Sequence, residues 1–102
     1  MAEQKPKYSV VAPVFNEVEG LQEFYEVLNS VMESVGEPWE LLFVDDGSVD
    51  GSRELILDLA RKDSHVIPLI FTRNFGHQIA VTAGMDHARG EAVIIIDADL
   101  QD

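Results

Sequence analysis

Hydrophobic positions along this chain fall into four short apolar runs, separated by three longer stretches with helical spacing. Short apolar runs bounded by turn-forming residues predict strands, here at 8–14, 39–44, 66–71 and 91–96. Between them, apolar residues recur every three or four positions, which predicts amphipathic helices. The first helix is expected to run from a cap at Asn16 to about residue 35, the second from Asp50 or Ser52 to about 61, and the third from about 75 to 88.

Strands that alternate with helices at this spacing predict the α/β class, with a three-layer, doubly wound, Rossmann-like and mainly parallel sheet. Right-handed crossovers favour strand order 3-2-1-4, and Pro68 favours an edge position for the third strand because proline cannot donate a ladder hydrogen bond. In this order the turns after strands one, two and four meet at one crevice. Most polar residues without an evident structural duty lie in these turns, at 15–17, 45–48 and 97–101.

Composition and charge exclude several classes of binding partner but say little about the fold. The chain has 102 residues and a formal net charge of −12, which argues against direct contact with nucleic acid or an anionic membrane surface. It has no cysteine, so thiolate sites and disulfides are excluded. Residues 1–7 are polar, are expected to be disordered and do not lead into a signal peptide, and no apolar stretch is long enough to span a membrane. We therefore expect a cytoplasmic polypeptide.

An acidic cluster follows the last apolar run, which is expected to be a buried strand. Asp97, Asp99 and Gln101 form a D-x-D-x-Q pattern at the exit of that strand. Carboxylate and amide oxygens are the ligands that Mg²⁺ and Mn²⁺ prefer, and such a cation could carry phosphate. The alternative is a solvated chain end in which Asp97 only caps a turn.

A second acidic turn, Asp45-Asp46-Gly47-Ser48, follows the second strand. Adjacent carboxylates are costly to hold together without a partner, so a base, a ribose or a cation is a plausible ligand. The alternative is a turn and a helix cap. The spacing also resembles the start of an EF-hand loop, but Leu57 stands where calcium requires a bidentate glutamate, which excludes that reading.

Single residues in the other turns remain open to two readings. Asn16 is most simply a cap, with Glu19 as its capping-box partner. Phe15 could stack on a nucleobase or join the core. Glu17 could accept a hydrogen bond from a ligand, or it could be a first-turn carboxylate that the helix dipole stabilises. Arg73 could neutralise a diphosphate or form a salt bridge. His77 and His87 are more simply read as structural or surface residues than as ligands.

Four segments, at 11–17, 44–48, 73–76 and 97–102, occur together in an order and spacing that resemble the family 2 glycosyltransferases of the GT-A fold. The sequence is most similar to the branch that uses polyprenyl phosphates, such as dolichyl-phosphate mannosyltransferase and the undecaprenyl-phosphate glucosyl- and aminoarabinose transferases. The resemblance covers residues 8–102 and implies the nucleotide-sugar-binding half of a catalytic domain, cut after the metal motif. On its own such a half is expected to be inactive, and it could self-associate through the open edge of its sheet.

The resemblance also implies roles for individual residues. The nucleotide would be bound by Pro13, Phe15, Glu17, Val44, Asp45, Asp46, Arg73 and Ala98. The catalytic residues would be Asp97 and Asp99, which with Gln101 would hold Mg²⁺ or Mn²⁺ against the diphosphate. A polyprenyl phosphate would attack the sugar with inversion, and the full-length enzyme would serve the cell envelope from the cytoplasmic face of the membrane.

Two other classes of function stay open at this point. A non-catalytic nucleotide- or metal-binding module would share the same acidic pocket. A phosphoacceptor receiver-like signalling domain is less favoured, because its paired acids should follow the first strand and a lysine should follow a later one. Here the pair Asp45-Asp46 follows the second strand, and the expected lysine is missing.

Overall fold

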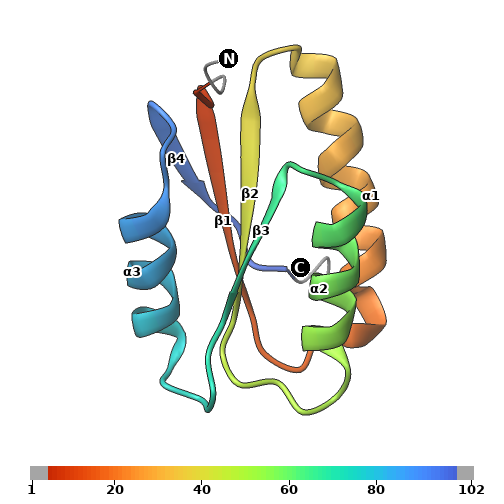
Figure 1. The fold of residues 1–102 in the computed structure, drawn as a ribbon, viewed down its shortest axis with the longest axis vertical. Coiled ribbons are helices and arrows are strands. Elements are labelled where there is room, and N and C mark those ends of the chain that lie inside the picture. Colours follow the sequence, from red (N-terminus) through yellow and green to blue (C-terminus); the bar gives the residue numbers. More distant parts are fainter. Residues whose placement is uncertain (1–4, 99–102) are drawn as a thin grey trace.

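The computed structural model describes residues 5–98, in which strands and helices alternate throughout. Figure 1 shows this arrangement. In chain order the elements are β1 (Tyr8–Val14), α1 (Val18–Val35), β2 (Trp39–Asp45), α2 (Ser52–Lys62), β3 (Val66–Ile70), α3 (His77–His87) and β4 (Ala92–Ile95). Each predicted element is present, with ends that differ from the sequence-based bounds by only one or two residues.

The four strands form one parallel sheet in the order β3-β2-β1-β4, which confirms the predicted order. The register pairs Tyr8 with both Trp39 and Ala92, so three strands begin at the same level. Strand β3, which contains Pro68, lies at one edge as predicted. Because all the strands are parallel, the turns after β1 and β2 open at the same end of the sheet, the lower end in Figure 1, and β4 runs in the same direction.

Helices cover both faces of the sheet and make three layers, with α1 and α2 on one face and α3 on the other (Figure 1). The face beneath α1 and α2 holds the larger core, in which Leu21, Phe24 and Phe43 are almost completely buried. The face beneath α3 holds a smaller core of Val11, Leu42, Val44 and Ala80. The doubly wound architecture is therefore the predicted one.

Helix α3 approaches the sheet closely because its inner face is made of small residues. Ala80 is completely buried, and a methyl group added at Gly84 would collide with the side chain of Val11 and meet Val44 Cγ2 at 3.2 Å. Ile79 does not belong to this inner face, because its side chain is 51% exposed. The small residues Ala80 and Gly84 permit this close approach, since a larger side chain at either position would push the helix away from the sheet.

Strand β4 is not the buried strand that its apolar run predicts. It pairs with β1 only, and Val93, Ile94 and Ile95 remain 39–45% exposed. An edge position explains the difference: within residues 5–98 no strand lies on the other side of β4 and little packs on its two faces. A continuous apolar run thus predicted a strand correctly but not its degree of burial.

The N-terminal end of the described chain is held by backbone hydrogen bonds. The Lys7 N–H donates to the Pro38 carbonyl at 2.8 Å, and the Lys7 carbonyl accepts from Glu91 and Ala92. Order therefore begins before Tyr8, inside the segment expected to be disordered; residues 1–4 lie outside the described range. None of the helices between residues 5 and 98 is long and apolar enough to cross a membrane.

Candidate functional site

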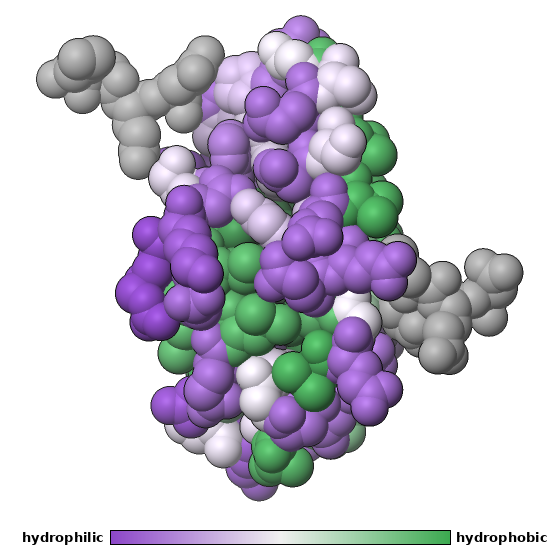
Figure 2. Space-filling model, turned by 90° about the vertical axis from the view of Figure 1, so that its right-hand side faces the viewer, coloured by the Kyte–Doolittle hydropathy of each residue, from purple (hydrophilic) through white to green (hydrophobic). Residues whose placement is uncertain are grey.

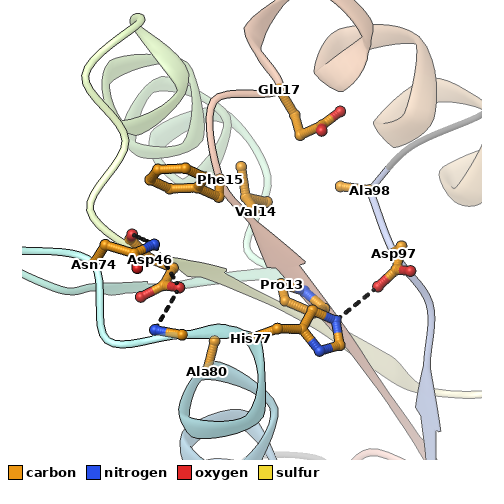
Figure 3. A pocket seen from close by; sticks show the side chains of 11 residues that line it. Pro13, Val14, Phe15, Glu17, Asp46, Asn74, His77, Ala80, Asp97 and Ala98 are labelled. Carbon is orange, nitrogen blue, oxygen red and sulfur yellow. Dashed lines mark hydrogen bonds and ion pairs between the residues drawn. The ribbon is translucent and has the colours of Figure 1, made fainter.

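A cavity of about 430 Å³ lies where β1 and β2 end and where the chain leaves β4. Figure 3 shows the side chains around it, which come from all three predicted turns and from the start of α3. The lining residues are Pro13, Val14, Phe15, Glu17, Asp46, Asn74, Gly76, His77, Ala80, Asp97 and Ala98. The structure therefore brings together Pro13, Phe15, Glu17, Asp46, Asp97 and Ala98 from the predicted set.

The turn after β1 is built differently from the predicted capping box. Asn16 has a φ of 53° and does not cap α1; its side-chain oxygen accepts the Val49 N–H at 2.9 Å, and its own N–H donates to Ser48 Oγ at 2.8 Å. The predicted pairing of Asn16 with Glu19 is thus wrong. The reason is that Ser48 and Val49, in the turn after β2, lie within hydrogen-bond distance of Asn16 and occupy both its N–H and its side-chain oxygen.

Helix α1 is capped from that same neighbouring turn. The Val18 N–H donates to Asp50 Oδ2 at 3.1 Å, and the Glu17 N–H donates to Ser52 Oγ at 3.0 Å. Asp50 Oδ1 in turn accepts from the Ser52 N–H and hydroxyl. Loss of solvation alone would raise the pKa of Asp50, but these hydrogen bonds outweigh it and hold the pKa below its usual value. The two turns therefore lock each other and fix the backbone that carries Phe15 and Glu17.

The aromatic ring of Phe15 stands at the cavity and is 46% exposed. An exposed phenylalanine on a locked turn is available for stacking, so the core reading of Phe15 is wrong. Glu17 is half-buried at the same wall, and Figure 3 shows both side chains around the upper part of the cavity.

Asp46 lines the cavity, but its carboxylate is committed to the β3–α3 loop. It is 3% exposed and accepts from Asn74 Nδ2 at 3.0 Å, from the Phe75 N–H at 2.7 Å and from the Gly76 N–H at 3.0 Å. Two successive backbone N–H groups around one carboxylate form a strong, charge-assisted anchor. Asp46 thus joins the end of β2 to the first turn of α3.

Asp45, Val44 and Arg73 do not line the cavity. Val44 is buried in the core beneath α3, and Asp45 is completely buried with Oδ2 accepting the Ser48 N–H at 3.1 Å. Within residues 5–98, Asp45 Oδ1 has no hydrogen-bond partner. The Arg73 guanidinium lies 4.5 Å from the centre of the Phe75 ring, where it makes a cation–π contact.

Gly47 explains why the loops after β2 and β3 lie against each other. Its φ is +81°, and a methyl group there would collide with the backbone at Arg73 and Asn74. Only glycine combines this conformation with such close approach of another backbone. The motif residue Gly47 thus holds the loop that supplies Asn74 and Gly76 to the cavity.

His77 and Asp97 meet across the open side of the cavity. His77 Nε2 lies 3.1 Å from Asp97 Oδ1, and the two side chains are 66% and 68% exposed. Figure 3 shows the contact as a bridge between the start of α3 and the exit of β4. The sequence reading of His77 as a structural or surface residue missed this contact, although its position at a predicted helix start beside the crevice was a usable signal.

The cavity has an acidic lining that would repel an anionic ligand by itself. Glu17, Asp46 and Asp97 contribute carboxylates, whereas no lysine or arginine occurs among the lining residues within 5–98. A diphosphate could enter such a site only with a cation that offsets these charges. The lining thus favours a hard divalent ion as the bridge.

The described residues supply one part of the expected cation site. Asp97 presents a carboxylate at the cavity, whose oxygen chemistry fits Mg²⁺ or Mn²⁺. Its predicted companions Asp99 and Gln101 lie outside the described residues. Between residues 5 and 98 no group of three or more histidine, cysteine, aspartate or glutamate side chains could hold a metal ion alone. Asp97 would therefore need these companions, or the ligand's own oxygens.

A parallel sheet with a cavity at its switch point is typical of ligand-binding α/β proteins, and comparison with known proteins gives the family. The family model "Glycosyl transferase family 2" matches residues 9–102, and the chain belongs to this family. It is 52% identical over 96 residues to "Uncharacterized glycosyltransferase YkcC" of Bacillus subtilis (strain 168), a match that covers 94% of this chain and 30% of that protein.

Other relatives point in the same direction. The chain is 45% identical over 96 residues to "Undecaprenyl-phosphate 4-deoxy-4-formamido-L-arabinose transferase" of Salmonella paratyphi B, covering 93% of this chain and 29% of that protein. A solved structure, the mannosyltransferase PcManGT from Pyrobaculum calidifontis in complex with GDP-Man and Mn²⁺, superposes with a TM-score of 0.76 at 28% identity. That match covers 94% of this chain and 28% of the other. The chain thus spans about 30% of the length of the curated relatives it matches.

Proposed function

We propose that residues 8–102 form the donor-binding half of a metal-dependent, inverting glycosyltransferase that passes a sugar from a nucleotide diphosphate to a polyprenyl phosphate. The observation that carries the proposal is the acidic cavity at the end of β1, β2 and β4, with an exposed aromatic ring on one wall and no lysine or arginine among its lining residues within 5–98. A nucleoside diphosphate with a divalent cation suits both features. The family membership and the relatives that act on undecaprenyl phosphate support the reaction class.

Each wall of the cavity would have its own task. The Phe15 ring would stack on the nucleobase, and Glu17 would accept a hydrogen bond from the base or the ribose. Asp46 would act through the loop that it anchors, because its carboxylate is already occupied by Asn74, Phe75 and Gly76. Asp97, together with Asp99 and Gln101, would hold Mg²⁺ or Mn²⁺, and the bound ion would supply Lewis-acid stabilisation of the departing diphosphate.

The reaction of a phosphate acceptor does not require a strong protein base. A polyprenyl phosphate is already anionic near neutral pH, so its oxygen can attack the anomeric carbon without first losing a proton. The new C–O bond forms on the face opposite the leaving diphosphate, which inverts the configuration. The acceptor would be supplied at the cytoplasmic face of the membrane and would be bound by parts of the full-length protein that correspond to the rest of its relatives.

A nuclear magnetic resonance titration of the 102-residue chain tests the donor site. UDP and GDP are added separately, each with and without Mg²⁺, and Mn²⁺ replaces Mg²⁺ to broaden signals close to the ion. We expect metal-dependent shifts at residues 13–17, 46, 74–77 and 97–101. Trp39 and His65 lie at the opposite end of the sheet and serve as the internal control.

Two outcomes separate the proposal from its alternatives. If saturating nucleotide and metal leave all cavity residues unperturbed, the donor-site proposal is refuted. If nucleotide binds but a full-length protein with lipid acceptor shows no turnover, the chain is a non-catalytic binding module.

A further inference from the structure

We propose that His77 is a positioning residue that orients the Asp97 carboxylate toward the divalent cation. This inference rests on the proposed function, because it concerns the same cavity. It adds a residue that lies outside the D-x-D-x-Q pattern and comes from a different element, the first turn of α3. The observation behind it is the 3.1 Å contact between His77 Nε2 and Asp97 Oδ1 (Figure 3).

The histidine side of this contact is held by a rigid support. Asp46 binds the Phe75 and Gly76 N–H groups immediately before His77, and Ala80, one turn further on, is completely buried against the sheet. The backbone at His77 is therefore fixed both before and after the residue. Although the imidazole itself is exposed, its attachment point cannot move without breaking buried contacts.

The aspartate side is held by the sheet. The Ile96 N–H donates to the Val11 carbonyl at 3.0 Å, so the chain follows β1 up to the residue before Asp97. Ala98, the residue after it, is 2% exposed and packs in the core beneath α1. Since successive side chains of an extended chain point to opposite faces, Asp97 is directed to the α3 face, where His77 begins.

The chemistry of the contact leaves one oxygen for a cation. An ionised carboxylate only accepts hydrogen bonds, so the His77 Nε2 must carry the hydrogen. That bond uses Oδ1, and within residues 5–98 the structure records no hydrogen bond to Oδ2. When one oxygen is held by a hydrogen bond, the carboxylate has fewer orientations in the free state. Binding a metal ion through the other oxygen then costs less conformational entropy. Partners of ligating carboxylates commonly change metal affinity by 10- to 100-fold when they are removed.

A simpler reading is an exposed ion pair of little consequence, and His87 provides the comparison. His87 is exposed at the other end of α3, and its Nδ1 lies 2.9 Å from the Ala83 carbonyl. Replacing either histidine removes an exposed imidazole from the same helix. Only the replacement of His77 should change the cation site.

The test measures Mn²⁺ affinity of the 102-residue chain by electron paramagnetic resonance, in the presence of GDP and separately of UDP. We expect H77A to weaken Mn²⁺ binding by about 10- to 100-fold, with thermal unfolding unchanged. H77Q should restore affinity close to that of the unaltered chain, because its side-chain amide can place a donor near the former Nε2 position. H87A should bind Mn²⁺ as the unaltered chain does. An imidazole ¹H–¹⁵N spectrum of the unaltered chain should show the hydrogen of His77 on Nε2.

Several results would overturn the inference. They are an H77A affinity equal to that of the unaltered chain, an H77Q affinity as weak as that of H77A, an equal loss in H87A, or a hydrogen on Nδ1 only. In each case Mn²⁺ binding by the unaltered chain would leave the proposed function standing. Absence of Mn²⁺ binding by the unaltered chain with either nucleotide would instead refute both.

Discussion

Replacing Asp46 with asparagine should loosen the start of α3. The Asp46 carboxylate accepts three hydrogen bonds, from the Asn74 side chain and from the Phe75 and Gly76 N–H groups. Asparagine keeps one acceptor oxygen and replaces the other with an NH₂ group that is itself a donor. If the remaining oxygen faces Phe75, the Gly76 N–H and one Nδ2 hydrogen of Asn74 face another donor and lose their bonds to the carboxylate, while Asn74 Nδ2 keeps its 3.1 Å bond to the Asp46 carbonyl.

The size of the effect follows from the number of bonds lost. A hydrogen bond to a charged group contributes about 1.5–3 kcal/mol, and Asn74 lies at the surface where water can replace part of it. Two lost bonds therefore cost about 2–4 kcal/mol in the free energy of opening this loop. At about 1.4 kcal/mol for each factor of ten, amide exchange at Phe75 and Gly76 should accelerate by roughly 30- to 700-fold.

Native-state hydrogen exchange followed by nuclear magnetic resonance is the assay, with D46N compared with the unaltered chain. Asp86 is exposed on the same helix, so D86N is the matched control and should leave exchange at Phe75 and Gly76 unchanged. The reasoning is wrong if D46N exchanges at the unaltered rate at both amides, or if D86N accelerates them equally.

Three further predictions concern packing, pH and association. G84A should lower the free energy of unfolding by about 1–3 kcal/mol, because the added methyl group collides with the sheet. G20A should raise it by about 0.5–1 kcal/mol, because no atom lies within 4 Å of the added methyl group. Urea unfolding that ranks the two variants in the opposite order contradicts the packing argument. The folded-state pKa of Asp50 is lowered, so its contribution is present above the unfolded value of about 3.9 and is lost as the pH falls through the folded value. D50N should therefore cost roughly 0.5–1 kcal/mol at pH 7, and the difference should shrink below about pH 4 in urea unfolding; a constant difference at all pH values would exclude the cap. We also propose that β4, with Ile95 45% exposed, lets copies of this chain pair edge to edge. Sedimentation velocity should then show association that I95K abolishes and V27K, an exposed position on α1, does not; association that survives I95K would place the contact elsewhere.

The sequence was sufficient to predict the fold because its local and long-range signals agree. Alternation of the apolar runs gave the elements, and the right-handed crossover rule with Pro68 at an edge gave the order β3-β2-β1-β4. Burial was less predictable, because the strength of an apolar run does not reveal how many neighbours cover it. Val93–Ile96 were expected to be buried, and their side chains remain 37–45% exposed at the edge of the sheet.

The candidate site was predicted to the level of the turns but not of the contacts. Topology brings Phe15, Asp46 and Asp97 to one cavity, as the crevice rule expects. The partners within that cavity depend on spacing between segments 20 or more residues apart in the chain, which local patterns do not contain. Asn16 therefore binds the turn after β2 instead of capping its own helix. For the same reason the contact of His77 with Asp97 was not predicted, since the two residues lie 20 positions apart in sequence.

The distinction between scaffold and ligand carboxylates affects how mutations in the acidic motifs should be read. Asp46 is 3% exposed with its carboxylate bonded to the β3–α3 loop, whereas the Asp97 side chain is 68% exposed. Loss of nucleotide binding in D46N would therefore follow from a displaced loop as readily as from a lost contact with the nucleotide. Of these two carboxylates, Asp97 has the exposure that a direct ligand needs, so D97N should reduce Mn²⁺ affinity without changing exchange at Phe75 and Gly76. Measuring Mn²⁺ affinity and amide exchange on both variants separates the two roles, because D46N should change the exchange and D97N should change only the affinity.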